Sequence, residues 1–393
     1  MNKKIKIPKD TRLRIYSSLI FSLLIIFSMY LFLYFLGVFA ERKEIIFIFS
    51  KTGFILIIIF LIPLVYSLFL KSSEKGIKIN EEDNEELFEI IKKISGDLNV
   101  KIPSKVIILP TADIYVSGFN KKILGLGITT LRAISKKELE SILYHEFGHF
   151  YGKDTVISSI FSKINISLVS LYNFGKNSIK KSRHPANILL NLYLILFLRC
   201  YLFIFNIFTS IYSRQVEYRA DYISSKFSGK KTFANALLNY SAYSYYFNKK
   251  GSEDIFKLIK EKKSCVNVYK LIYENYKKED TNKIKEEILK KEKTSLFSSH
   301  PTLKERIEKV NIDISSLKIK NKLKNNSNTL FKKIDEEKLS EDLVNSLYFR
   351  MVYLDAILRE GKCKFCSKQF KTLNDLLKHE LICEKKPVEN NSS

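Results

Sequence analysis

The sequence lacks the features of several common protein classes. Its five cysteines are odd in number and widely spaced, which argues against a secreted disulfide scaffold. Tryptophan is absent while lysine, isoleucine and asparagine are abundant, a composition that we attribute to nucleotide bias in the source genome. Hydrophobic residues make up 46%, too many for a disordered chain, and 393 residues allow two or three folded units of ~150 residues each.

Acidic residues are few relative to basic ones. The chain has 66 lysines and arginines against 41 acidic residues, which gives a formal net charge of +25. The lysines are spread along the whole length and form no clustered patch. Anionic lipid is therefore as good a partner for this charge as nucleic acid.

Charged residues are missing from two long segments near the N-terminus. The first runs over 26 residues from Ile15 to Ala40 and the second over 19 residues from Thr52 to Leu70. The first segment exceeds the apolar core of a signal peptide, about 7–15 residues, and can cross a hydrocarbon layer of ~30 Å as a helix. We expect a transmembrane hairpin; the alternative, two buried core helices, is less favoured because the segments have no polar face.

The charges that flank this hairpin indicate its orientation. Six basic residues and one acidic residue precede the first segment, Lys71, Lys75 and Lys78 follow the second, and the loop between them is nearly balanced. Basic flanks tend to stay in the cytoplasm. The chain after residue 71 is therefore predicted to begin on the cytoplasmic side.

Residues 137–150, KELESILYHEFGHF, have the periodicity of a helix, with Ser135 as its N-cap. His145 and His149 are four residues apart, so both imidazoles project from one face and can reach one zinc ion. Glu146 lies beside them, where it can take a proton from an attacking water. The short pattern also arises by chance, as an exposed helical turn with two solvated histidines.

Zinc with two histidines needs a third protein ligand. Thr155 occupies the last position of the pattern H-E-x-x-H-x-x-G-x-x-H, which excludes that subclass. In residues 213–222, SRQVEYRADY, Glu217 could complete the zinc shell and Asp221 could orient a histidine. Taken alone, this segment is better interpreted as an ordinary charged helix face with Arg214 and Arg219 as partners.

Three blocks, HEFGH, SRQVEYRAD and LFSSHPTLKERIEKV at 296–310, occur in this order after an apolar hairpin. Together they resemble the HtpX-type membrane zinc metallopeptidases, gluzincins that are related to the CAAX prenyl proteases. The resemblance covers roughly residues 1–310. It implies zinc held by His145, His149 and Glu217, with Glu146 as the base, in a cytoplasm-facing site that cleaves membrane or misfolded proteins.

Residues 112–131 predict a β-hairpin before the metal-binding helix. In gluzincins the strand at this place is a sheet edge that pairs with the substrate backbone, and a plain structural hairpin is an equal alternative. By that analogy the candidate substrate strand consists of Ile114, Tyr115, Val116, Ser117 and Gly118.

The block from residue 296 contains His300 before Pro301, which restricts His300 to extended geometry. The resemblance implies a place near the active site, where His300 could approach the metal or an oxyanion. The simpler interpretation is a helix-start turn in which Thr302 caps a helix and Arg306 pairs with an acid.

Two further apolar segments, 155–175 and 186–213, separate the metal-binding blocks, but they contain Lys163 and Arg199. Glu217 must return to the side of His149, so both segments cross the membrane or neither does. The resemblance favours a second hairpin and four spans in all. The internal charges and a basic connecting loop favour segments that dip into or lie on the cytoplasmic face.

The C-terminal segment 363–383 has the spacing C-x2-C-x12-H-x3-C, which resembles the two-Cys, His, Cys variant of the ββα zinc finger. A unit this small needs its ion to fold. Two roles stay open for it: contact with nucleic-acid phosphate, which one finger would bind only weakly, and protein docking or substrate recruitment, which is at least as well supported. The predicted ligands are Cys363, Cys366, His379 and Cys383, with Phe370 and Leu376 as core residues.

These observations predict a mainly α protein with a small β-sheet, an α+β gluzincin core in a multi-pass membrane chain. The expected units are the hairpin 1–78, a peptidase core 79–230 that includes the apolar hairpin 155–213, a helical extension 231–320, a charged connector and helix 321–360, and a finger 361–393. We expect a zinc endopeptidase of the cell membrane with one catalytic and one structural Zn²⁺, acting on protein or peptide substrates. The alternatives are a non-cleaving membrane regulator and a membrane tether for nucleic acid.

Overall fold

The computed structural model divides the chain into two compact units. The first comprises Met1–Tyr246 and Tyr276–Lys333, and the second comprises Phe247–Asn275 and Ile334–Ser393. Nearly all of the predicted N-terminal hairpin lies outside the described residues. The structure describes residues 76–118, 121–181, 185–251, 253–255, 267–292, 298–320, 336–341 and 343–345, the single positions 9, 11, 20 and 295, the stretch 13–17, and 362, 363, 366–370, 375, 376, 379 and 383 near the C-terminus.

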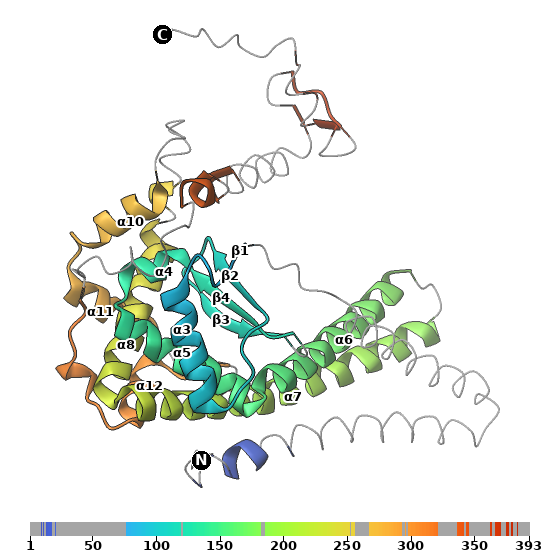
Figure 1. Ribbon diagram of the computed structural model, residues 1–393. Coiled ribbons are helices and arrows are strands. Elements are labelled where there is room, and N and C mark those ends of the chain that lie inside the picture. The colour runs from blue at the N-terminus through green and yellow to red at the C-terminus, as the bar shows by residue number, and fades with distance from the viewer. Residues whose placement is uncertain are drawn as a thin grey trace. The chain divides into compact units, whose positions relative to one another are not determined.

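A four-stranded mixed sheet forms one side of the first unit (Figure 1). Its strands are β1 (Ile77–Ile79), β2 (Lys105–Leu109), β3 (Ile114–Ser117) and β4 (Ile123–Gly127), in the order β1-β2-β4-β3. β2 and β4 are parallel, while β1 and β3 run antiparallel to their neighbours. The predicted hairpin is thus confirmed as β3–β4, and β3 is an edge strand of this sheet.

Glycine in β4 lets the hairpin close tightly. Gly125 pairs with Tyr115, and a Cβ at Gly125 would lie 2.8 Å from the Tyr115 ring. The ring therefore packs over the neighbouring backbone, which only glycine permits. This contact helps to hold β3 in register along the sheet edge.

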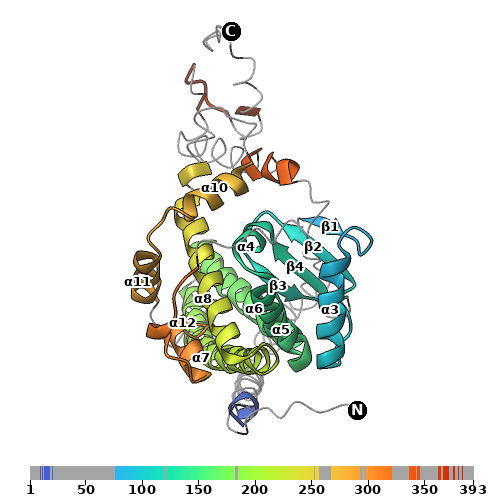
Figure 2. The same cartoon turned by 60° about the vertical axis from the view of Figure 1, so that its left-hand side comes forward.

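The predicted metal-binding helix is α5 (Lys136–Gly152). Ser135 caps it as expected, because its side chain accepts from the Glu138 backbone while Glu138 bonds back to the Ser135 N–H. The helix packs against α3 (Glu85–Leu98), α7 (Pro185–Ser228) and α8 (Lys230–Tyr246), and α5 and α8 both lie beside β3 in Figure 2. α5 ends at Gly152, and the φ of 59° at its C-cap residue Lys153 turns the chain before the next helix begins.

Two long helices follow α5. They are α6 (Asp154–Lys181) and the 44-residue α7, which lie side by side in Figure 1. Edge-to-face ring contacts join Phe161 of α6 to Phe205 and Tyr212 of α7. By length and composition alone, Asp154–Lys181 and Ile195–Ser228 could each cross a membrane. Several large apolar side chains on both helices are exposed, namely Ile160, Ile166, Val169, Phe174, Leu192, Leu196, Phe203 and Ile204.

Short elements complete the first unit. After the sheet comes α4 (Ile128–Ala133), and after α8 come α11 (Thr281–Lys291), α12 (Leu303–Lys309) and the 3₁₀ turn η2 (Ile314–Ser316). Thr302 caps α12 with Glu305 as its reciprocal partner, which confirms the simpler role predicted for Thr302. α8 and α11 confirm that the described parts of 231–295 in this unit are helical.

The second unit contains the π-helical turn η1 (Phe247–Gly251), most of α10 (Val268–Tyr276) and the C-terminal segments. The start of α10 is tied to residues 336–340, because the Val268 N–H donates to Ser340 Oγ at 3.1 Å and the Tyr269 hydroxyl donates to the Leu339 carbonyl at 3.2 Å. The four predicted finger ligands belong to this unit.

Candidate metal centre

Helix α5 brings two imidazoles to one point. His145 and His149 are one helical turn apart, and their Nε2 atoms are separated by 3.3 Å. Both side chains are nearly buried, with exposed fractions of 11% and 15%. The spacing that predicted a shared face therefore gives two convergent nitrogen donors.

Helix α7 supplies a carboxylate to the same point. Glu217 Oε2 lies 3.4 Å from His145 Nε2, and Glu217 Oε1 lies 3.7 Å from His149 Nε2. In a tetrahedral site with ligand bonds of 2.0–2.1 Å, neighbouring donor atoms are about 3.3 Å apart. The three donors thus have the separations that one zinc ion requires, and they form one of two His/Cys/Asp/Glu groups in the described part of the chain that could hold a metal.

Each imidazole has its other nitrogen bound to an aspartate. His145 Nδ1 lies 2.9 Å from Asp221 Oδ1, and His149 Nδ1 lies 3.1 Å from Asp154 Oδ2. An Nδ1–H that donates to a carboxylate leaves the Nε2 lone pair available for a metal. The sequence pointed to Asp221 for this role, whereas it gave no indication of Asp154.

Each aspartate is in turn paired with an arginine. Arg306 of α12 donates to Asp221 from Nε at 2.9 Å and from Nη2 at 2.6 Å, and its Nη2 lies 3.3 Å from Glu217 Oε2. Arg219 of α7 pairs with Asp154. Gly152 makes room for this pair, since a Cβ there would collide with the Arg219 guanidinium group.

The charges around the imidazoles do not balance without an ion. With neutral histidines, the carboxylates of Glu146, Asp154, Glu217 and Asp221 outnumber the two guanidinium groups that the described structure places against them, those of Arg219 and Arg306. A divalent cation bound by the imidazoles would offset this excess of negative charge. The chemistry and separation of the donors and the excess charge all fit Zn²⁺.

The pKa values reflect the same excess of negative charge. Burial disfavours the charged ring of His145, but hydrogen bonds to Asp221 and Glu217 outweigh it and raise the pKa to about 10. Burial also raises the pKa of Glu146, against the opposing effect of His145 and His149. A hydrogen bond to Glu217 raises the pKa of His300. The metal-free centre therefore favours the addition of positive charge.

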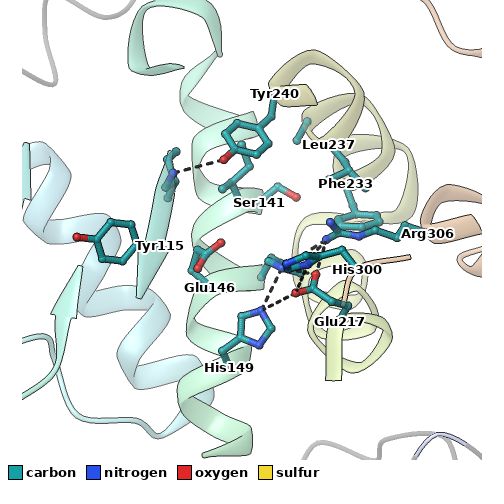
Figure 3. A pocket seen from close by; sticks show the side chains of 14 residues that line it. Tyr115, Ser141, Glu146, His149, Glu217, Phe233, Leu237, Tyr240, His300 and Arg306 are labelled. Atoms are coloured by element: carbon teal, nitrogen blue, oxygen red, sulfur yellow. Dashed lines mark hydrogen bonds and ion pairs between the residues drawn. The ribbon is translucent and has the colours of Figure 1, made fainter. Parts of the chain in front are cut away.

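Two cavities meet at the centre, and both are lined by Glu146, His149, Glu217 and His300. The first, of about 340 Å³, extends toward α8 and has an apolar wall (Figure 3). The second, of about 700 Å³, extends between α6 and α7 and is rich in hydroxyl groups. The apolar wall consists of Ile142, Phe233, Ala236 and Leu237, and the hydroxyl groups belong to Thr155, Ser158, Ser159, Ser213 and Ser299.

The predicted substrate strand borders both cavities. Ile114 and Tyr115 line the first, while Val116, Ser117 and Gly118 line the second. At the start of the strand, the Ile114 N–H donates to the Tyr240 hydroxyl at 3.4 Å (Figure 3). Tyr240, whose pKa burial and the charge of Glu146 raise to about 12, is a lining residue that the sequence did not indicate.

The structure brings the other predicted residues of this centre together. His300 Nδ1 lies 3.2 Å from Glu217 Oε1, although 69% of its side chain is exposed. Glu146 projects between α5 and β3 (Figure 3). The predicted cysteine ligands belong to the second unit, where they form the other described group that could hold a metal. Asp154, Arg219 and Tyr240 were missed, because no sequence spacing links them to the histidines.

Comparisons with known proteins agree on one family. The model of Peptidase family M48 matches residues 81–312. A protease HtpX homolog of Pyrococcus furiosus is 28% identical over 170 residues, which cover 41% of this chain and 57% of the relative. The HtpX homolog of Campylobacter hominis is 28% identical over 106 residues, which cover 26% of this chain and 37% of the relative. That of Archaeoglobus fulgidus is 25% identical over 157 residues, which cover 39% of this chain and 46% of the relative.

The matched region thus spans between about a third and three fifths of the length of these curated relatives. Among solved structures, the crystal structure of S. mikatae Ste24p aligns with a TM-score of 0.41 and 16% identity, over 76% of this chain and 67% of that chain.

Proposed function

This chain belongs to peptidase family M48, whose model covers more than half of its residues, and we propose that it is a membrane-bound zinc endopeptidase. Its substrates are membrane or misfolded proteins, which it hydrolyses on the cytoplasmic face. The observation that carries the proposal is the convergence of His145, His149 and Glu217 beside Glu146, in a cavity bordered by an edge strand.

Zinc is held in this proposal by His145, His149 and Glu217, and it would supply Lewis acidity toward a water molecule and the scissile carbonyl. Glu146 lines the same cavity and is not a ligand. Its carboxylate accepts the proton of the attacking water and later gives a proton to the leaving nitrogen.

His300 and Arg306 line the same cavity and carry or can carry positive charge. The Arg306 guanidinium group is fixed by Asp221 and Glu217, so its role is to position these two carboxylates. His300 is exposed to the cavity and has one ring nitrogen engaged with Glu217. It is therefore placed to contact the substrate near the reacting carbonyl, or to support Glu217 alone.

The outer edge of β3, the edge away from β4, binds the substrate backbone in this proposal. Because the Ile114 N–H is directed to Tyr240 and away from β4, alternation along a strand directs the Val116 N–H and C=O to the same outer edge. An extended peptide paired there would run from the hydroxyl-lined cavity to the apolar cavity, past Glu146. Backbone pairing imposes little sequence preference, which suits misfolded substrates.

A paired cleavage assay tests the proposal. Wild type, Glu146→Gln and the matched control Glu140→Gln are purified in detergent with zinc and incubated with an unfolded protein. Glu140 lies on the same helix but pairs with Lys93, away from the centre. We expect cleavage by wild type and E140Q only, its loss on chelation, and equal zinc in all three proteins.

Absence of cleavage in all three proteins, with zinc retained, would contradict the peptidase proposal and favour a non-cleaving membrane regulator. Retention of full activity by E146Q would contradict the role of Glu146 as the base. Binding of DNA or RNA with a steep dependence on salt would instead favour a nucleic-acid tether.

A further inference from the structure

The four predicted finger ligands converge in the second unit. The distance between Cys363 Sγ and Cys383 Sγ is 3.9 Å, and that between Cys366 Sγ and His379 Nε2 is 3.2 Å. All four donor atoms lie within 4.8 Å of one another. These residues lie beyond the region 81–312 that the family model matches, so the family assigns them no role.

We propose that this cluster is a second, structural zinc site, closed by four protein ligands. It is independent of the site formed by His145, His149 and Glu217, which we call the peptidase centre. The proposed ligands are Cys363, Cys366, His379 and Cys383.

The separations fit a metal and exclude a disulfide. In a tetrahedral site with Zn–S bonds of ~2.3 Å, two sulfur atoms are about 3.8 Å apart. A disulfide would bring them to ~2.05 Å, roughly half the observed distance. Three thiolates and one imidazole in a compact arrangement are typical of structural Zn²⁺.

The backbone around the first two cysteines forms a tight turn that aims both sulfur atoms inward. The Ser367 N–H donates to the Cys363 carbonyl at 2.9 Å, and the Cys363 N–H donates to the Lys368 carbonyl at 2.9 Å. Ser367 has a φ of 59°, and an isolated antiparallel bridge joins Lys362 to Gln369. Local hydrogen bonds therefore define the turn that carries the first two ligands.

The apolar core of this cluster is small in the part of the finger that the structure describes. Leu376 is fully buried against Cys363 and Cys383, and Phe370 packs at the side with its ring 4.7 Å from that of His379. These two described side chains contribute about 3–6 kcal/mol of burial, less than the ordering of some 20 residues costs. Zinc binding would supply the missing free energy.

The two centres differ in chemistry and can be distinguished. The peptidase centre has two nitrogens, a carboxylate and a cavity beside them, so it leaves a coordination position open. The proposed site has four ligands, of which Cys363 and Cys383 are buried. Of these two centres, only the cysteine site can give thiolate-to-metal charge-transfer absorption.

The test uses the full-length protein in detergent, with Zn²⁺ counted by elemental analysis and Co²⁺ as the spectroscopic probe. We expect two zinc ions per chain in wild type and in the control Cys200→Ser, an exposed cysteine in α7. The double variant Cys363→Ser/Cys383→Ser should hold one ion and lose the thiolate–cobalt band. His145→Gln should also hold one ion but keep that band.

Zinc in the double variant equal to that in wild type, or a cobalt spectrum without a thiolate band in H145Q, would overturn the proposal. If H145Q and wild type both hold one ion and the double variant holds none, the proposal of a cysteine site is supported and the proposal of zinc in the peptidase centre is contradicted. The two proposals are thus tested separately.

Wild-type protein provides a check that needs no variant. A thiol-specific maleimide is applied with and without prior zinc removal, and mass spectrometry measures labelling at each cysteine. We expect the three cluster cysteines to be protected until zinc is removed, while Cys200 reacts in both samples. Equal labelling in both samples, or a disulfide joining Cys363 to Cys383, would contradict a metal site.

Discussion

Two chains of hydrogen bonds fix the direction in which the imidazoles of the peptidase centre point. Each chain runs from a histidine to an aspartate and on to an arginine on another element. The arginines neutralise the aspartates, and the aspartates keep the proton on Nδ1 of each ring. The two chains are His145–Asp221–Arg306 and His149–Asp154–Arg219.

Substitution of Asp154 by asparagine should weaken zinc binding without unfolding the protein. The amide oxygen still accepts from Nδ1, but it no longer carries the charge that makes the imidazole a strong ligand. We expect zinc affinity to fall about 10- to 100-fold, measured by competition with a chromogenic chelator. Asp97→Asn is the matched control, since Asp97 bonds to Tyr144 and touches neither histidine. An unchanged affinity in D154N would show that Asp154 does not act through His149.

Sequence periodicity indicates one of these aspartates as a residue of the centre, but it gives no indication of the other. Asp221 lies four residues after Glu217 in a continuous helix, so its place beside the centre could be inferred from spacing. Asp154 follows Lys153, whose left-handed conformation ends α5 and restarts the chain in a new direction. A position beyond such a turn has no fixed helical phase relative to His149. Arg219 pairs with Asp154 across two helices, a contact that only the folded chain defines.

At the scale of elements, local patterns predicted more than long-range pairing did. The β3–β4 hairpin and the capping of α5 and α12 are encoded by turn and capping residues within a few positions of each other. The three-residue β1 and the parallel pairing of β2 with β4 depend on contacts between distant segments, and the sequence gave no sign of them. The position of β3 at the sheet edge follows from that long-range arrangement.

Replacing Val116 by proline tests whether the edge of β3 binds substrate. Proline removes an N–H that faces away from β4, so the sheet itself should persist. We expect cleavage of an unfolded protein to fall at least several-fold, mainly through a higher KM, while the zinc content stays that of wild type. Val116→Ala is the control, because it shortens the side chain but keeps the backbone donor. Equal KM values for V116P and V116A would argue against backbone pairing at this position.

At the scale of the whole molecule, α6 and α7 are the described helices that are long and apolar enough to cross a membrane, and both carry residues of the metal centre. A 44-residue helix is about 66 Å long, more than twice the ~30 Å hydrocarbon layer. If the N-terminal half of α7 spans the bilayer, its C-terminal turns with Glu217 and Asp221 remain outside it. α6 begins at Asp154 and α7 returns to the same centre, so both helices cross or neither does.

The charge of Lys163 in α6 costs less free energy within a membrane than its position in an apolar segment suggests. Lys163 lines the hydroxyl-rich cavity together with Ser158, Ser159 and Ser213, so its charge can face water within the protein. Charges in membrane helices are tolerated where they face a bundle interior or a water-filled cavity. Arg199 of α7 is exposed and does not line that cavity. In a four-span arrangement the basic residues Lys176, Lys180 and Lys181 would also have to cross. Of the two internal charges, Lys163 is therefore no longer an argument against four spans, whereas Arg199 still is.

Labelling from the two sides of the membrane distinguishes the arrangements. Asn177→Cys places a thiol at the far end of α6, and the control Lys101→Cys places one beside β2; both positions are exposed. With four spans, a membrane-impermeant maleimide should label N177C in intact cells and K101C only after permeabilisation, as read by mass spectrometry of each peptide. The reason is that a crossing α6 carries residue 177 through the bilayer, whereas the sheet stays on the side of the basic flank. Labelling of both thiols only after permeabilisation would mean that α6 and α7 lie on or dip into the cytoplasmic face. Labelling of K101C in intact cells would reverse the predicted orientation of the peptidase centre.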